Sequence, residues 1–74
     1  MTIHEYQTLT PSSQAVQILK DGVMLNSRMQ GIKEYILFKM DSFYVEIEYS
    51  KFQEKITNLF SFCSTDYLKQ YENL

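Results

Sequence analysis

The alternation of apolar and polar residues in the centre of the chain constrains the fold most. Between residues 23 and 50 the period is two residues, which is typical of half-buried strands. Gln30-Gly31 and Asp41-Ser42 are the candidate turns. The sequence therefore predicts three strands joined by tight turns, at residues 23–29, 32–40 and 43–50.

The two turns sort the side chains consistently. A turn at 41–42 places Phe38 opposite Val45, and a turn at 30–31 places Leu25 opposite Ile36 and Val23 opposite Phe38. Directly opposed residues share a face, and a one-residue slip would send every side chain to the other face. Both turns therefore predict one apolar face, made of Val23, Leu25, Ile36, Phe38, Met40, Phe43, Val45, Ile47 and Tyr49.

Two helix starts precede the strands. Thr2, with Glu5 three residues later, has the spacing of a capping box and predicts a short helical turn over residues 3–8. Thr10-Pro11 is an N-cap residue followed by proline at the first helical position, which predicts a helix from Pro11 to about Lys20.

The second helix is expected to end at Gly22, in the left-handed conformation that glycine commonly adopts after a helix. Lys20 suits the negative C-terminal end of this helix. Its apolar side is expected to consist of Ala15, Val16, Ile18 and Leu19.

Residues 51–74 allow two interpretations. A helical spacing of apolar residues extends over Phe52, Ile56, Leu59, Phe60, Cys63, Tyr67 and Tyr71. Several residues between 57 and 65 nevertheless favour strands over helices, and Ser64 or Thr65 followed by Asp66 resembles a new helix start. We prefer a fourth strand at about 55–63 and a short helix at about 65–73, with one long helix as the alternative.

The expected fold is α+β: one domain over residues 1–74, a two-layer sandwich. An N-terminal helix precedes an antiparallel four-stranded meander and a short C-terminal helix, and the helices cover the apolar face of the sheet. The alternative has three strands and one long C-terminal helix. A core this small gives little net stability, and one cysteine allows no internal disulfide. Self-association or a protein partner is therefore expected to add stability.

Composition narrows the function classes. The 45% apolar content argues for a folded chain, and the net charge of −2 gives no general attraction to phosphate. The beginning of the chain resembles no signal peptide, and the longest apolar run is too short to span a membrane. With one unpaired cysteine, we expect a cytoplasmic protein that does not bind membranes.

The sequence points away from an enzyme. His4, the single histidine, has no visible partner and is expected at the surface, and Cys63 lacks a basic neighbour and is expected to be buried. Glu46 and Glu48 share one face of a strand, but a flat face would desolvate neither carboxylate for acid–base chemistry. We expect no metal, because the sequence has no Cys/His cluster that could hold zinc. We expect no cofactor and no small-molecule substrate, because a chain this short has little room for a ligand pocket.

The second face of the sheet is the candidate binding surface. It is richer in tyrosine and methionine than a solvated face requires, and Tyr, Met and Arg are enriched at protein interfaces. We predict binding of a second copy or of another protein through Met24, Arg28, Tyr35, Leu37, Lys39, Tyr44 and Glu46.

Single-stranded nucleic acid is the alternative partner for the same face. Tyr35 and Tyr44, with nearby basic residues, resemble a stacking platform. Glu46 and Glu48 would repel phosphate there, so the sequence favours a protein partner.

Overall fold

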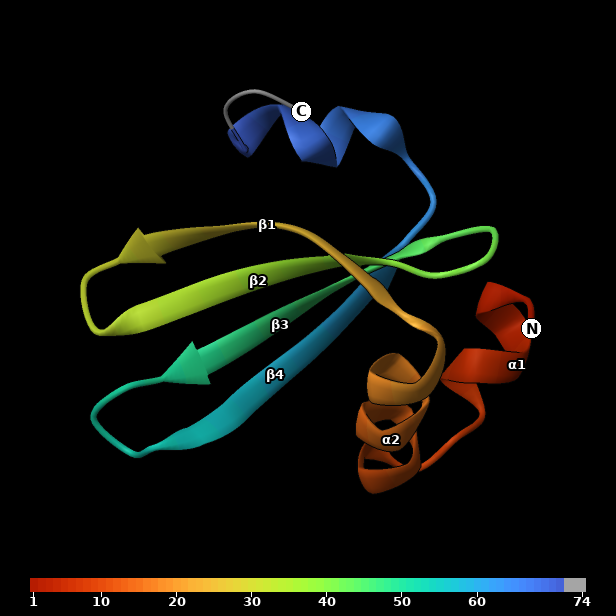
Figure 1. The fold of residues 1–74 in the computed structure, drawn as a ribbon, viewed down its shortest axis with the longest axis horizontal. Coiled ribbons are helices and arrows are strands. Elements are labelled where there is room, and N and C mark those ends of the chain that lie inside the picture. The colour runs from red at the N-terminus through yellow and green to blue at the C-terminus, as the bar shows by residue number, and fades with distance from the viewer. Residues whose placement is uncertain (72–74) are drawn as a thin grey trace.

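The computed structural model describes residues 1–71. Within them the chain forms two N-terminal helices, a four-stranded antiparallel sheet and a short C-terminal 3₁₀ helix (Figure 1). The predicted α+β order of elements is confirmed. The end of the helix expected at 65–73 lies outside the described residues. The elements are α1 (Ile3–Gln7), α2 (Pro11–Asp21), β1 (Val23–Gln30), β2 (Lys33–Lys39), β3 (Tyr44–Ser50), β4 (Lys55–Phe62) and η1 (Thr65–Gln70).

The sheet is a meander in the order β1-β2-β3-β4. The predicted β2–β3 register is confirmed, because Phe38 lies opposite Val45 and Ile36 opposite Ile47. A fourth strand occupies Lys55–Phe62, so the preferred interpretation of this segment is right and the long helix is wrong.

The predicted β1–β2 register is wrong by two residues. The turn lies at Gly31-Ile32, so Ser27, and not Leu25, is opposite Ile36. Gly31 has a φ of 63°, a left-handed conformation that glycine adopts without steric cost. A shift of two residues keeps the alternation of faces, so Arg28 still shares a face with Tyr35.

A bulge near the start of β1 changes the faces of its first residues. The register shifts between Met24 and Asn26, which places Met24 opposite Phe38 and Val23 opposite Lys39. Sequence reasoning predicts the reverse, with Val23 opposite Phe38. An unbroken alternation cannot signal one extra residue in a strand, and that residue reverses the faces beyond it.

The helix starts follow the predicted capping. The Thr2 side chain accepts a hydrogen bond from the Glu5 backbone N–H at 3.2 Å, and the Glu5 carboxylate accepts from the Thr2 N–H at 2.8 Å. The Thr10 side chain caps α2 by accepting a hydrogen bond from the Ser13 backbone N–H at 3.2 Å. Gly22 is extended, with φ −79° and ψ 149°, so the left-handed cap is wrong. Glycine is needed there for space, because a Cβ would lie 2.6 Å from the Ile18 carbonyl oxygen.

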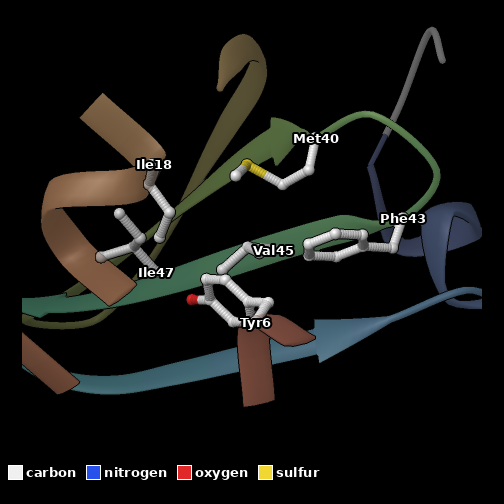
Figure 2. Packing of buried hydrophobic residues seen from close by; sticks show 6 residues of the cluster. All are labelled: Tyr6, Ile18, Met40, Phe43, Val45 and Ile47. Atoms are coloured by element: carbon white, nitrogen blue, oxygen red, sulfur yellow. The ribbon is translucent and has the colours of Figure 1, made fainter. Parts of the chain in front are cut away.

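The main core lies between the N-terminal helices and one face of the sheet. Figure 2 shows Tyr6 of α1 and Ile18 of α2 beside residues of β3 and of the β2–β3 connection. Val16 and Leu19 of α2 are exposed, against the prediction that both lie on its apolar side. The core cluster is Tyr6, Ile18, Met40, Phe43, Val45 and Ile47.

The C-terminal 3₁₀ helix packs on the opposite face of the sheet. Tyr71 is buried in a second cluster with Leu37 and Phe62, separate from the main core, and Tyr67 and Leu68 pack against it. Figure 1 shows η1 on one side of the strands and α2 on the other. The prediction that all helices cover one face is therefore wrong, and the sheet has a small apolar cluster on each side.

Tyr6 offers a test of the main core. Among residues 1–71 its buried hydroxyl has no hydrogen-bond partner. We expect Tyr6→Phe to raise the free energy of unfolding by about 1 kcal/mol, since a buried polar atom without a partner carries a desolvation cost. Urea denaturation measures this change. A lower stability of Tyr6→Phe would contradict the assignment.

The same variant has a signature at alkaline pH. Burial raises the pKa of Tyr6 from 10.0 to about 12. The neutral hydroxyl is therefore favoured over the ionised one in the folded state, so ionisation of Tyr6 leaves the stability of the wild type unchanged below pH 10 and lowers it as the pH rises toward 12. We expect the wild type to lose more stability over this interval than Tyr6→Phe.

Candidate functional site

The outer face is the side of the sheet that carries η1. The register places Arg28, Tyr35 and Glu48 in one row across β1, β2 and β3. The neighbouring row holds Leu37 and Glu46. The structure therefore brings together four of the residues predicted for partner binding, Arg28, Tyr35, Leu37 and Glu46, and places Glu48 beside them.

Glu46 is buried at the centre of the outer face, with 4% of its surface exposed. Its carboxylate accepts hydrogen bonds from the hydroxyls of Tyr67, at 2.8 Å, and Tyr71. The Arg28 guanidinium lies 3.7 Å away, within ion-pair distance. Burial, followed by the hydrogen bond to Glu46, raises the pKa of Tyr71. This carboxylate thus holds the C-terminal segment on the sheet.

Arg28 lies between two aromatic rings. Its guanidinium carbon is 4.2 Å from the centre of the Tyr35 ring and 5.4 Å from that of Tyr71, both within the range of a cation–π contact. One terminal nitrogen also donates to Gln30 at 3.1 Å. Arg28 Nε is buried without a partner among the described residues. One face of the Tyr35 ring is consequently occupied by Arg28.

Glu48 is the centre of a second polar cluster. Its carboxylate accepts hydrogen bonds from Thr57 at 2.7 Å, Tyr35 at 3.0 Å and Lys33 at 3.3 Å. These bonds, led by that from Thr57, lower the pKa of Glu48, and the bond to Glu48 raises the pKa of Tyr35. The β3–β4 register shifts between Glu48 and Tyr49 and skips Thr57, which belongs to the bulge.

Three predicted partner-binding residues are not accessible on the outer face, where the prediction places them. Leu37 and Glu46 are buried under η1. Met24 is 62% exposed, but the β1 bulge places it opposite Phe38, on the face of the main core.

The remaining predicted residues differ in how much of them is accessible. Tyr44 is half-buried, and the centre of its ring lies 5.5 Å from the centre of the Phe62 ring. The Lys39 ammonium lies 5.1 Å from the centre of the Tyr44 ring. Lys39 is exposed, and Arg28 and Tyr35 are half-buried.

The accessible part of the outer face surrounds a hollow of about 330 Å³. The sequence pattern predicts no binding role for Asn58, Phe60 and Tyr67, which line part of it. Phe60 and Tyr67 have a helical spacing in the sequence, but this spacing does not indicate that the segment after β4 packs on the outer face. We call this hollow, together with the residues that line it, the aromatic hollow. The lining residues are Arg28, Tyr35, Glu46, Glu48, Asn58, Phe60 and Tyr67.

The charged groups of the aromatic hollow are paired with groups of opposite charge. Each carboxylate has a cation and hydroxyl donors within contact distance. Within residues 1–71, no three His, Cys, Asp or Glu side chains gather where they could hold a metal ion. His4 is exposed as predicted, whereas Cys63, expected in the core, is exposed at the end of β4.

Comparisons with protein-family models, with curated proteins and with solved structures give no match for this chain. Over the described residues, no helix has the length and apolar content needed to cross a membrane.

Thr57 tests the second polar cluster. Because the Glu48 pKa is lowered in the folded state, its contribution to stability is present above the ordinary glutamate pKa and is lost as the pH falls through the folded pKa. We expect Thr57→Val to raise the Glu48 pKa and to weaken the acid dependence of stability. Carboxyl ¹³C NMR titration measures the pKa. Thr8→Val, on the far side of the sheet, should leave it unchanged.

Proposed function

We propose that this protein is a non-catalytic protein-interaction module that binds a second copy of itself or another protein through the accessible part of its outer face. The carrying observation is the aromatic hollow, where Tyr35, Phe60 and Tyr67 lie around charges that are already paired. Tyrosine and arginine are enriched at protein interfaces, and aromatic residues in pockets are frequent binding hot spots.

The internal pairing favours a protein partner over a substrate. A catalytic carboxylate needs an oxygen that a substrate can reach, whereas the oxygens of Glu46 and Glu48 already accept hydrogen bonds from tyrosine and threonine hydroxyls and lie beside Arg28 and Lys33. Such a network holds side chains in fixed positions. A preorganised surface loses little conformational freedom on binding, which supports recognition.

We also propose a cytoplasmic location. Cys63 is exposed and is the single cysteine of the chain. A reducing compartment keeps such a thiol from pairing with another molecule.

Nucleic acid remains the alternative partner, with weaker support. One face of the Tyr35 ring is occupied by Arg28, and Tyr44 is packed against Phe62. Arg28 and Lys33 are ion-paired, so phosphate would have to displace a carboxylate from each. Binding of mixed oligonucleotides that weakens steeply with salt would favour this alternative. An absence of binding at low salt would remove it.

Light scattering over a range of protein concentrations tests self-association. We expect the mass to rise with concentration, and we expect Tyr35→Glu and Phe60→Glu to raise the dissociation constant at least about tenfold, since each places a charge in the proposed interface. The control is Phe52→Glu, because Phe52 is 81% exposed on the β3–β4 turn, outside the aromatic hollow.

A strict monomer at high concentration would leave another protein as the partner, to be captured by wild type and lost with the same two variants. The proposal is wrong if the folded variants change neither self-association nor capture.

A further inference from the structure

The C-terminal segment is attached to the outer face through a few side chains. Tyr67 and Tyr71 donate to the carboxylate of Glu46, and Leu68 packs on the same cluster. η1 is a 3₁₀ helix of six residues, and so short a helix has little stability of its own. The position of residues 65–71 therefore depends on the surface that receives them.

The connection to η1 has the features of a hinge. Cys63 and Ser64 join β4 to η1, and both are exposed. Ser64 has extended backbone angles, φ −70° and ψ 130°, and its side chain accepts a hydrogen bond from the Asp66 N–H at 3.2 Å. An exposed connection of two residues, the second of them extended, can redirect the segment that follows without disturbing the sheet.

The main core does not include the C-terminal segment. Tyr6 and Ile18 pack with residues of the other sheet face, whereas Tyr71 belongs to the separate cluster with Leu37 and Phe62. Segments with few buried contacts open at a lower free energy than the rest of a protein. Residues 65–71 can therefore leave the outer face while the helices and the sheet stay folded.

We propose that the outer face of one copy receives the C-terminal segment of a second copy, with residues 65–71 exchanged between the two. This inference rests on the proposed function: it names a second copy as the partner and places that copy's segment on the part of the outer face that η1 covers, which shares Glu46 and Tyr67 with the aromatic hollow. The occupant follows from the contacts: within residues 1–71, this segment already fits the outer face, burying Tyr71 and satisfying Glu46. In the exchanged dimer, Glu46 of each copy accepts hydrogen bonds from the second copy's Tyr67 and Tyr71.

Exchange forms a closed, symmetric dimer in which each contact between the segment and the outer face is made twice, once from each copy to the other. The contact energy of the segment is the same in both forms. The equilibrium between monomer and exchanged dimer therefore depends on the translational entropy that two copies lose on association and on the free energy of opening the hinge. For this reason the dimer fraction rises with concentration, as required for self-association through this face.

A mixing experiment with two defective variants tests the exchange. Glu46→Gln weakens the receiving face, and Tyr71→Phe removes one hydroxyl from the segment. An exchanged heterodimer has one intact Glu46–Tyr71 contact, whereas neither homodimer has any. Native mass spectrometry, with one variant isotopically labelled, should show heterodimers at least about threefold above the statistical level, the ratio expected from a hydrogen-bond coupling of this kind.

The control mixture combines Glu46→Gln with Tyr6→Phe, since Tyr6 lies in the main core. Its heterodimers should stay near the statistical level. Both variants keep Tyr71, so in the two homodimers and in the heterodimer each outer face receives a segment with an intact Tyr71, and no pairing is favoured. An equal excess in both mixtures overturns the exchange. If Tyr35→Glu still weakens those dimers, the proposed function stands without it.

A synthetic peptide of residues 64–74 gives a second test with the wild-type chain. It should dissociate the dimer, and the same peptide with Tyr71→Phe should be at least about fivefold weaker, from the loss of one hydrogen bond to a charged group. A dimer that neither peptide affects overturns the exchange. A monomer that captures another protein overturns the exchange alone, and a protein with no association of any kind overturns both proposals.

Discussion

The β2–β3 pair determines both faces of this molecule. Phe38 lies opposite Val45 on the side of the N-terminal helices, and Leu37 lies opposite Glu46 on the outer side. Because side chains alternate along a strand, the register that builds the main core also places a carboxylate at the centre of the opposite face. The C-terminal segment, the polar clusters and the aromatic hollow all depend on that placement.

A buried carboxylate needs partners, and this need explains the path of the chain after β4. An isolated charge under a protein surface is costly, whereas charge-assisted hydrogen bonds with well-placed donors offset the cost. Tyr67 and Tyr71 supply the donors for Glu46, and Arg28 supplies the opposite charge. The rings of both tyrosines extend the apolar cluster around Leu37, so the segment is held by polar and apolar contacts together.

The same arrangement connects the stability of the C-terminal segment with the shape of the proposed binding surface. The outer face is divided into a part covered by η1 and an accessible part around Tyr35, Phe60 and Asn58. Glu46 and Tyr67 line the aromatic hollow and also hold η1 in place. An event that moves the C-terminal segment therefore changes the shape of the proposed binding surface, because the two share side chains.

Local patterns in the sequence determined much of the fold. Thr2 with Glu5 and Thr10 before Pro11 specified the helix starts through hydrogen bonds that span three residues. The alternation of apolar residues specified the strands and the β2–β3 register, because one apolar face must be buried. These signals are readable because each involves residues close in the chain.

Tertiary structure alone decided the rest. The bulge beside Met24 moved that side chain to the other face, and the burial of Leu37 and Glu46 depends on where η1 packs. Two tyrosines with a helical spacing can cover either side of a sheet. The outer side is chosen by the buried carboxylate of Glu46, a residue more than twenty positions away, with which the tyrosine hydroxyls form hydrogen bonds. A pairing at such a distance leaves no pattern in a single sequence, because it exists after the strands have assembled.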